Sequence, residues 1–182
     1  NLFETNSYAA IIKDADVLFH LAAENTTSMS NASRVLENTD KLTQTVLQAC
    51  HENTVKTVIY TSSVVVIGRS ADANRPLTEN DVNPFAESPY VLGKMQAEKF
   101  VANFIQQYNY DIRRVYPSWA VGGNDPKLTP PHKVIKDFLE KGAPVYFDGG
   151  ISIAAVEEIA KGHVLAYEKG KFGETYILSG EN

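Results

Sequence analysis

The sequence has a single cysteine and no run of basic residues, and each of these scarcities argues against a class of protein. Cys50 has no second cysteine with which to form an internal disulfide, which fits a reducing compartment and predicts a cytoplasmic protein. The formal net charge is −5, whereas proteins that bind nucleic acid present a basic face. We therefore expect no nucleic-acid partner.

Long apolar segments, targeting signals and metal-ligand patterns are also missing. No apolar stretch approaches the roughly 20 residues that a membrane-spanning helix needs, so no membrane partner is expected. Residues 1–4 show neither the basic nor the apolar part of a signal peptide. The four histidines are scattered without the spacing of metal ligands, which predicts packing or surface roles and no metal. They are His20, His51, His132 and His163.

What the sequence does contain is an alternation of strand-like and helix-like segments. The chain has 182 residues, of which 43% are hydrophobic, enough for one sizeable core. Short apolar or β-branched runs predict strands at residues 16–21, 56–61, 111–116, 144–147 and 175–178. Apolar residues at helical intervals predict helices at 32–52, 88–108, 134–139 and 156–168, after a helix that ends over 8–13.

This alternation predicts an α/β fold with a doubly wound parallel sheet. Polar loops are expected over residues 25–33 and 68–87. Ligands of such sheets bind beyond the carboxyl ends of the strands. Small or polar residues stand there after three of the expected strands, namely Ala22, Ala23, Ser62, Ser63, Pro117 and Ser118.

Tyr90 and Lys94 form the clearest chemical pattern. They stand four residues apart near the start of the expected helix 88–108, so they share one helix face. A nearby ammonium and the positive end of a helix stabilise a phenolate, so we expect a lowered pKa for Tyr90. The hydroxyl of Ser63 would hydrogen-bond a substrate carbonyl oxygen and stabilise a developing alkoxide. Together these residues predict a site of proton transfer to a carbonyl compound.

The order of these motifs resembles the short-chain dehydrogenase/reductase superfamily. Thr-Ser-Ser at 61–63 is followed by Tyr-x-x-x-Lys at 90–94. Other segments are similar to the extended branch, which includes sugar-nucleotide epimerases and dihydroflavonol-4-reductase-like ketone reductases. These segments lie at 20–23, 37–39, 117–122 and 173–180. Each motif alone is weak, so the resemblance rests on their joint order and spacing, which cover nearly all of the chain.

The resemblance implies NAD or NADP as cofactor and a role for each matching residue. Tyr90 would be the general acid/base, Lys94 would bind the nicotinamide ribose, and Ser63 would polarise the substrate carbonyl. The implied cofactor-binding residues are Leu21, Ala22, Ala23, Asn38, Thr61, Ser62, Tyr90, Lys94, Pro117 and Ser118. Simpler interpretations stay open, with Tyr90 and Lys94 as surface helix residues, Ser63 as a strand-end cap and Asn38 as an ordinary helix residue.

The sequence departs from the family pattern in lacking the glycine-rich dinucleotide fingerprint. The resemblance therefore implies a Rossmann-like domain without its first strands, and poor cofactor binding by the isolated chain. Residues 1–118 would be the remainder of the NAD(P)-binding domain and 119–172 mainly a substrate-binding region. Residues 173–182 would supply a late strand that returns to the sheet.

A second departure narrows the reaction. Val64 and Val65 stand where the dehydratases of the family carry an Asp-Glu pair, and Ile67 replaces the usual tyrosine of a following turn. Valine cannot transfer a proton, so dehydration is not expected. Hydride transfer to or from a ketone or alcohol remains, either as net reduction or as a step in sugar epimerisation. Substrate-facing candidates are Trp119 and the loops 69–87 and 124–132.

The partner is therefore expected to be a small-molecule ketone or a sugar nucleotide, and the assembly a homodimer. Two other functions stay open. One is a regulatory module that binds dinucleotide without turnover, and the other is an inactive fragment of such an enzyme. The Tyr90–Lys94 pair favours catalysis, because regulatory relatives typically lack it.

Overall fold

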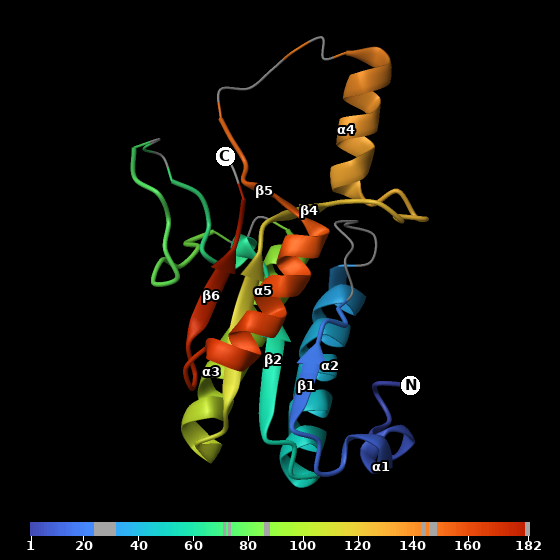
Figure 1. Cartoon of the computed structure of the whole chain (residues 1–182), viewed down its shortest axis with the longest axis vertical. Helices are drawn as coiled ribbons and strands as arrows, with labels where there is room; N and C mark the ends of the chain where they lie inside the picture. Colours follow the sequence, from blue (N-terminus) through green and yellow to red (C-terminus); the bar gives the residue numbers. More distant parts are fainter. Residues whose placement is uncertain are drawn as a thin grey trace.

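The computed structural model describes residues 1–23, 32–70, 72, 74–85, 88–142, 145 and 149–180, and its centre is a parallel sheet (Figure 1). The strands follow the order β1-β2-β3-β6, and each neighbouring pair is parallel. Their bounds are β1 (Val17–His20), β2 (Thr57–Thr61), β3 (Ile112–Pro117) and β6 (Thr175–Leu178). The predicted α/β class is confirmed.

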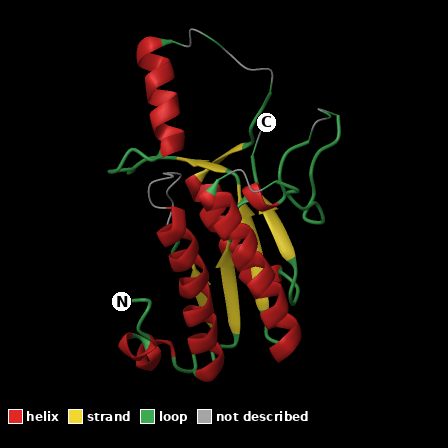
Figure 2. Cartoon of the chain, turned by 180° about the vertical axis from the view of Figure 1, so that it is seen from behind, coloured by secondary structure: helices red, strands yellow, loops and turns green. Residues whose placement is uncertain are grey.

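Helices cover both faces of this sheet, as a doubly wound fold requires. On one face α2 (Ala32–Glu52) and α3 (Pro89–Tyr108) pack against each other. On the other face α5 (Val156–Lys169) crosses β2, β3 and β6 (Figures 1 and 2). Side chains of a strand alternate between the faces. Val58 and Tyr60 accordingly join the α2–α3 core, while Ile59 packs in a cluster with residues of α5.

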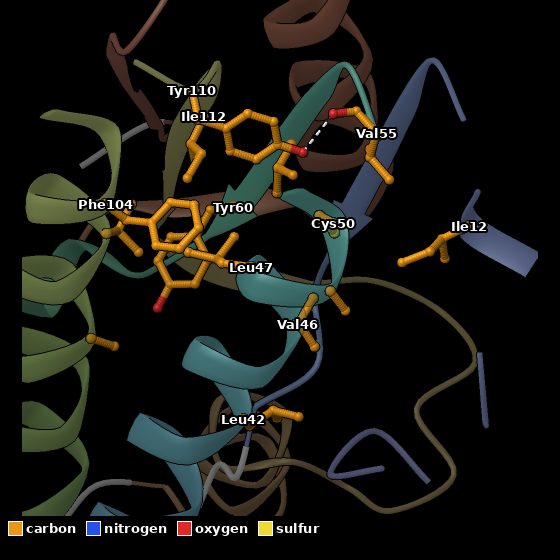
Figure 3. Close-up of a cluster of buried hydrophobic side chains, with 14 residues drawn as sticks. Ile12, Leu42, Val46, Leu47, Cys50, Val55, Tyr60, Phe104, Tyr110 and Ile112 are labelled. Carbon is orange, nitrogen blue, oxygen red and sulfur yellow. Dashed lines mark hydrogen bonds between the residues drawn. The ribbon is translucent and has the colours of Figure 1, made fainter. Parts of the chain in front are cut away.

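Cys50 lies in the larger of the hydrophobic cores. Cys50 is fully buried on α2 among aliphatic and aromatic side chains (Figure 3), and its burial raises the pKa of the thiol to about 12. Above this cluster the hydroxyl of Tyr110 donates a hydrogen bond to the carbonyl of Val55 at 2.6 Å. That bond satisfies a buried polar group and joins the start of β3 to the start of β2. Cys50 is therefore a residue of the hydrophobic core.

The remaining elements lie at the two ends of the sheet. The short helices η1 (Thr5–Ser7) and α1 (Ala9–Ile12) precede β1. A second, two-stranded parallel sheet pairs β4 (Trp119–Val121) with β5 (Ile153–Ala155), which the sequence did not predict. Helix α4 (Pro130–Lys141) begins four residues before the expected start at residue 134, and it stands away from the main sheet (Figure 1).

Two expectations fall largely outside the described residues. They are the strand over 144–147, of which only residue 145 is described, and most of the loop over 25–33. In the described parts of the chain, no helix is both long enough and apolar enough to cross a membrane. The same residues contain no group of three or more His, Cys, Asp or Glu side chains that would hold a metal ion.

Candidate active site

The start of α3 is fixed by the local sequence, and this places the predicted catalytic pair. The side chain of Ser88 accepts a hydrogen bond from the backbone N–H of Val91 at 3.3 Å, and Pro89 occupies the first helical position. Tyr90 therefore lies in the first turn and Lys94 one turn later, on the same face. The predicted helix is confirmed.

Ser63 reaches Tyr90 from the end of β2. It lies two residues beyond the strand and caps the short helix η3 (Val64–Val66) by accepting from the N–H of Val65. Its hydroxyl lies near enough to the phenol of Tyr90 to lower the pKa of that phenol. The structure thus places the predicted proton-transfer residue and the predicted carbonyl-polarising residue beside each other.

The pKa of Tyr90 moves in the opposite direction from the one expected from the sequence. Burial of the phenol raises this pKa, and the Ser63 hydroxyl lowers it by less. Burial disfavours the phenolate, and it depends on packing that the local sequence around Tyr90 and Lys94 does not reveal. The phenol is consequently protonated at neutral pH and is able to donate its proton.

Lys94 is buried beneath the site, with 4% of its surface exposed. Its Nζ donates a hydrogen bond to the carbonyl oxygen of Thr61, the last residue of β2, at 3.2 Å. Burial lowers the pKa of the ammonium to about 8, while the charge of Glu98 acts to raise it. A lysine held in this way still carries a proton at neutral pH. The structure therefore shows Lys94 as a buried group of the site and not as a solvated surface charge.

Two residues beside Lys94 were missed by the sequence reading. Glu98 lies one further turn along α3 and accepts hydrogen bonds from the Tyr116 hydroxyl at 2.7 Å and from Arg114 at 3.4 Å. His20, at the end of β1, is buried, and burial together with the charge of Lys94 lowers its pKa to about 4. The spacing of Tyr90, Lys94 and Glu98 by fours was the available signal for Glu98.

Three of the predicted cofactor-binding residues line one surface hollow. Ala22, Ala23 and Asn38 surround it together with Phe3 and Leu42, and its volume is about 330 Å³. Leu21 precedes Ala22, directly follows β1 and exposes 58% of its surface.

Buried polar atoms at the strand ends provide a test of whether these residues fit a dinucleotide. The Nε2 of His20 and the hydroxyls of Ser62 and Ser118 are buried without a hydrogen-bond partner in the part of the chain that the structure describes. An unpaired buried polar group costs about 1–3 kcal/mol. The three residues lie at the carboxyl ends of the neighbouring strands β1, β2 and β3. Unpaired groups at this edge of the sheet fit a polar ligand such as a nicotinamide dinucleotide.

Pro117 and Ser118 complete the predicted set at the end of β3. Pro117 is the register partner of Leu178 in β6, and the N–H of Ser118 donates to the Leu178 carbonyl at 3.0 Å. Strand pairing therefore fixes these two residues at the edge that carries Thr61 and Ser62. The next residue, Trp119, begins β4 and is half-buried.

The segment after Ser63 carries two valines and is held in place by a hydrogen bond from Asn83. Val64 and Val65 are half-buried, and the Asn83 side chain donates to the carbonyl of Val65 at 2.8 Å. Gly68 has φ of +87°, and a Cβ on it would lie 3.1 Å from the Cα of Asn83. A larger residue at position 68 would therefore push this segment away from Asn83. Both valines stand next to Ser63 without a group that exchanges protons.

Comparison with known proteins supports this arrangement. The model of a family described as the NAD dependent epimerase/dehydratase family matches residues 1–178. A protein from Synechocystis sp. (strain ATCC 27184 / PCC 6803 / Kazusa), provisionally named a dihydroflavonol 4-reductase, is 32% identical over 171 residues. That match covers 91% of this chain and 49% of the relative, so the chain spans about half of that protein's length.

Solved structures also match the chain. The crystal structure of gox2253 matches with a TM-score of 0.90 and 34% identity, covering 100% of this chain and 56% of that one. A UDP-N-acetylglucosamine 4-epimerase from Methanobrevibacter ruminantium M1, in complex with UDP-N-acetylmuramic acid, matches with a TM-score of 0.76 and 28% identity. That match covers 94% of this chain and 57% of the epimerase.

Proposed function

The chain belongs to the NAD-dependent epimerase/dehydratase family, and we propose that the protein carrying it is an NAD(P)-dependent oxidoreductase. The proposed reaction transfers a hydride to or from a ketone or alcohol carbon. The observation that carries this proposal is the placement of Ser63 beside Tyr90, whose pKa it lowers, one helical turn from the buried Lys94. Such a cluster combines a proton donor and a second hydroxyl with a buried cation beneath them.

Each residue has a defined part in the proposed ketone reduction. The Ser63 hydroxyl donates a hydrogen bond to the substrate carbonyl oxygen and stabilises the negative charge that develops there. Tyr90, a neutral phenol because burial raises its pKa, transfers its proton to that oxygen. Lys94 holds the nicotinamide ribose and stabilises the phenolate left on Tyr90. The bound nicotinamide supplies the hydride, and one hydride and one proton together convert the ketone to an alcohol.

The cofactor is proposed to lie along the carboxyl edge of the sheet. Leu21, Ala22, Ala23 and Asn38 would contact it at the hollow beside β1, and Thr61, Ser62, Pro117 and Ser118 would do so at the ends of β2 and β3. The unpaired hydroxyls of Ser62 and Ser118 support this placement.

Net reduction is the favoured reaction of the two that the site allows. Val64 and Val65 provide no carboxylate beside Ser63, which argues against a dehydratase. The relative from Synechocystis carries a reductase name, which supports a small-molecule ketone as the substrate. A sugar-nucleotide epimerase is the second candidate, because a UDP-N-acetylglucosamine 4-epimerase matches at 28% identity.

The test assays the protein that carries this chain with NADH and with NADPH against a panel of ketones and UDP-sugars. Consumption of the reduced nicotinamide with a ketone is the expected result. Interconversion of UDP-sugars without net consumption would instead establish the epimerase. Dinucleotide binding without turnover on either panel would support the regulatory module, and the absence of both would identify the protein as inactive.

Three further features of the protein are proposed on the sequence. The region 119–172 would contribute mainly to substrate binding, with Trp119 and the loops 69–87 and 124–132 facing the substrate. A cytoplasmic location is proposed because the lone cysteine fits a reducing compartment. A homodimer is proposed by resemblance, and light scattering of the purified protein tests it.

A further inference from the structure

We propose that His163 is a positioning residue that fixes Lys94 through Thr61, an inference that rests on the proposed function. His163 lies in α5 and exposes only 5% of its surface. Its Nε2 lies 2.9 Å from the hydroxyl oxygen of Thr61, and its Nδ1 lies 2.8 Å from the carbonyl oxygen of Ile159. Both ring nitrogens therefore have partners, although the histidine belongs to a helix on the opposite face of the sheet from α3.

The partners of the ring decide the direction of each hydrogen bond. A carbonyl oxygen only accepts, so Nδ1 of His163 carries a proton and donates it to Ile159. In the neutral imidazole Nε2 is then an acceptor, and the Thr61 hydroxyl donates to it. The hydroxyl of Thr61 is thereby directed toward α5, and the χ1 angle of this residue is fixed.

The same threonine bears the acceptor for Lys94. Its side chain points toward α5, while its carbonyl oxygen accepts the ammonium of Lys94 from α3 at 3.2 Å. Thr61 pairs with Val115 of β3, but the pairing of β2 with β1 already ends at Tyr60. The end of β2 therefore has a strand neighbour on one side only. The bond to His163 supplies a second restraint at the residue that holds Lys94.

Lys94 depends on this acceptor because it is buried. An ammonium whose pKa burial has lowered needs well-placed acceptors to stay charged and in position. Loss of the bond between His163 and Thr61 would free the strand end and displace the Lys94 Nζ. The lysine would then meet the ribose of the dinucleotide in poorer geometry. His163 would affect dinucleotide affinity without touching the dinucleotide.

The experiment uses the protein that carries this chain, with Thr61→Val and His163→Leu made singly and together. Titration with NADH and NADPH and steady-state kinetics give the dinucleotide Kd, KM and kcat. Each single variant is expected to raise Kd and KM about 5–10-fold, with a smaller change in kcat. The double variant is expected to match the single ones, since both substitutions remove the same bond.

Two further variants separate positioning from stability. His163→Gln keeps a side-chain acceptor for the Thr61 hydroxyl, so it should bind dinucleotide nearly as wild type does. Thr57→Val is the matched control on the same strand and the same face, where the hydroxyl bonds to Asp111 at 3.1 Å. It should lower stability and leave dinucleotide affinity unchanged.

The results distinguish failure of the positioning role from failure of the proposed reaction. Additive losses in the double variant, no rescue by His163→Gln, or an equal loss of affinity in Thr57→Val would overturn the positioning role. Binding of dinucleotide without turnover of any ketone or sugar would contradict the proposed reaction alone, because the coupling between His163 and Thr61 is measured by binding. A wild-type protein that binds no dinucleotide would overturn both.

Discussion

The Nζ of Lys94 lies 3.2 Å from the carbonyl oxygen of Thr61, and this contact joins the first turns of α3 to the end of β2. Ser63 lies two residues beyond Thr61, and Tyr90 lies one turn before Lys94. The contact between Lys94 and Thr61 therefore helps to hold together the two segments that carry the proposed chemistry. Burial of the charged ammonium costs free energy, and this is seen in its pKa, which burial lowers from 10.5 to about 8.

We predict that Lys94→Met stabilises the fold while it abolishes activity. At pH 7 the lysine is charged in both the folded and the unfolded chain, so folding pays the full cost of burying the charge. A lowering of the pKa from 10.5 to about 8 corresponds to about 3 kcal/mol. The lost hydrogen bond to Thr61 offsets part of this gain. Urea unfolding at pH 7 should show an increase of about 1–3 kcal/mol in the free energy of unfolding.

The pH dependence provides the control for this prediction. Between pH 8 and 10.5 the unfolded chain binds the lysine proton and the folded chain releases it, so wild-type stability rises with pH. Above pH 10.5 the advantage of Lys94→Met should disappear. Lys99→Met replaces an exposed lysine of the same helix and should not reproduce the gain. A Lys94→Met protein less stable than wild type at pH 7 would show that the lysine is not strained by burial.

His20 predicts a loss of stability in mild acid. Burial, and then the charge of Lys94, lower its pKa from 6.5 to about 4. Within this window the unfolded chain binds a proton that the folded chain does not, so stability falls as the pH falls. The contribution is about 3 kcal/mol between pH 6.5 and 4. The variant His20→Gln has no such group, and urea unfolding across this range should give it a smaller decrease than wild type. Equal slopes for the two proteins would contradict the buried neutral histidine.

Ser63→Ala tests the second hydroxyl of the site. Loss of a donor to the developing oxyanion should reduce kcat for ketone reduction by about 10²–10³-fold. The Ser63 hydroxyl also lowers the pKa of Tyr90. Removal of this hydroxyl should therefore raise the pKa of Tyr90 further. Reduction needs the protonated phenol, and the alkaline limb of the kcat profile should therefore move to higher pH.

Ser63→Thr supplies the matched variant, since it keeps a hydroxyl at the same position. It should recover most of the rate and return the alkaline limb toward its wild-type position. If Ser63→Ala kept the wild-type rate and profile, Ser63 would be only a cap of η3.

Local patterns were sufficient to predict much of the fold. The bounds of α2, the Ser88 cap of α3 and the strand β6 follow from periodicity and capping residues that neighbours in the chain supply. The strands β4 and β5 were not predicted, because three residues each are too few to show a period. The lowering expected for the Tyr90 pKa was wrong, because burial depends on packing between distant segments.

The candidate site, too, was predicted only in part. The order of the motifs around Ser63, Tyr90 and Lys94 predicted residues that the structure brings together. Glu98 was missed because the spacing along α3 places it on the face of Tyr90 and Lys94 but does not show that its partner Tyr116 comes from β3. His163 was grouped with ordinary histidines, since its bond to Thr61 spans the sheet.

The most direct test of the central claim is the kcat of Tyr90→Phe, measured beside its dinucleotide Kd in the protein that carries this chain. Phenylalanine keeps the ring and removes only the hydroxyl that is the proposed proton donor. The predicted result is a fall in kcat for ketone reduction of about 10²–10⁴-fold, with a nearly unchanged Kd for NADH or NADPH. A Tyr90→Phe protein that reduces ketones at the wild-type rate would contradict the assignment of Tyr90 as the proton donor.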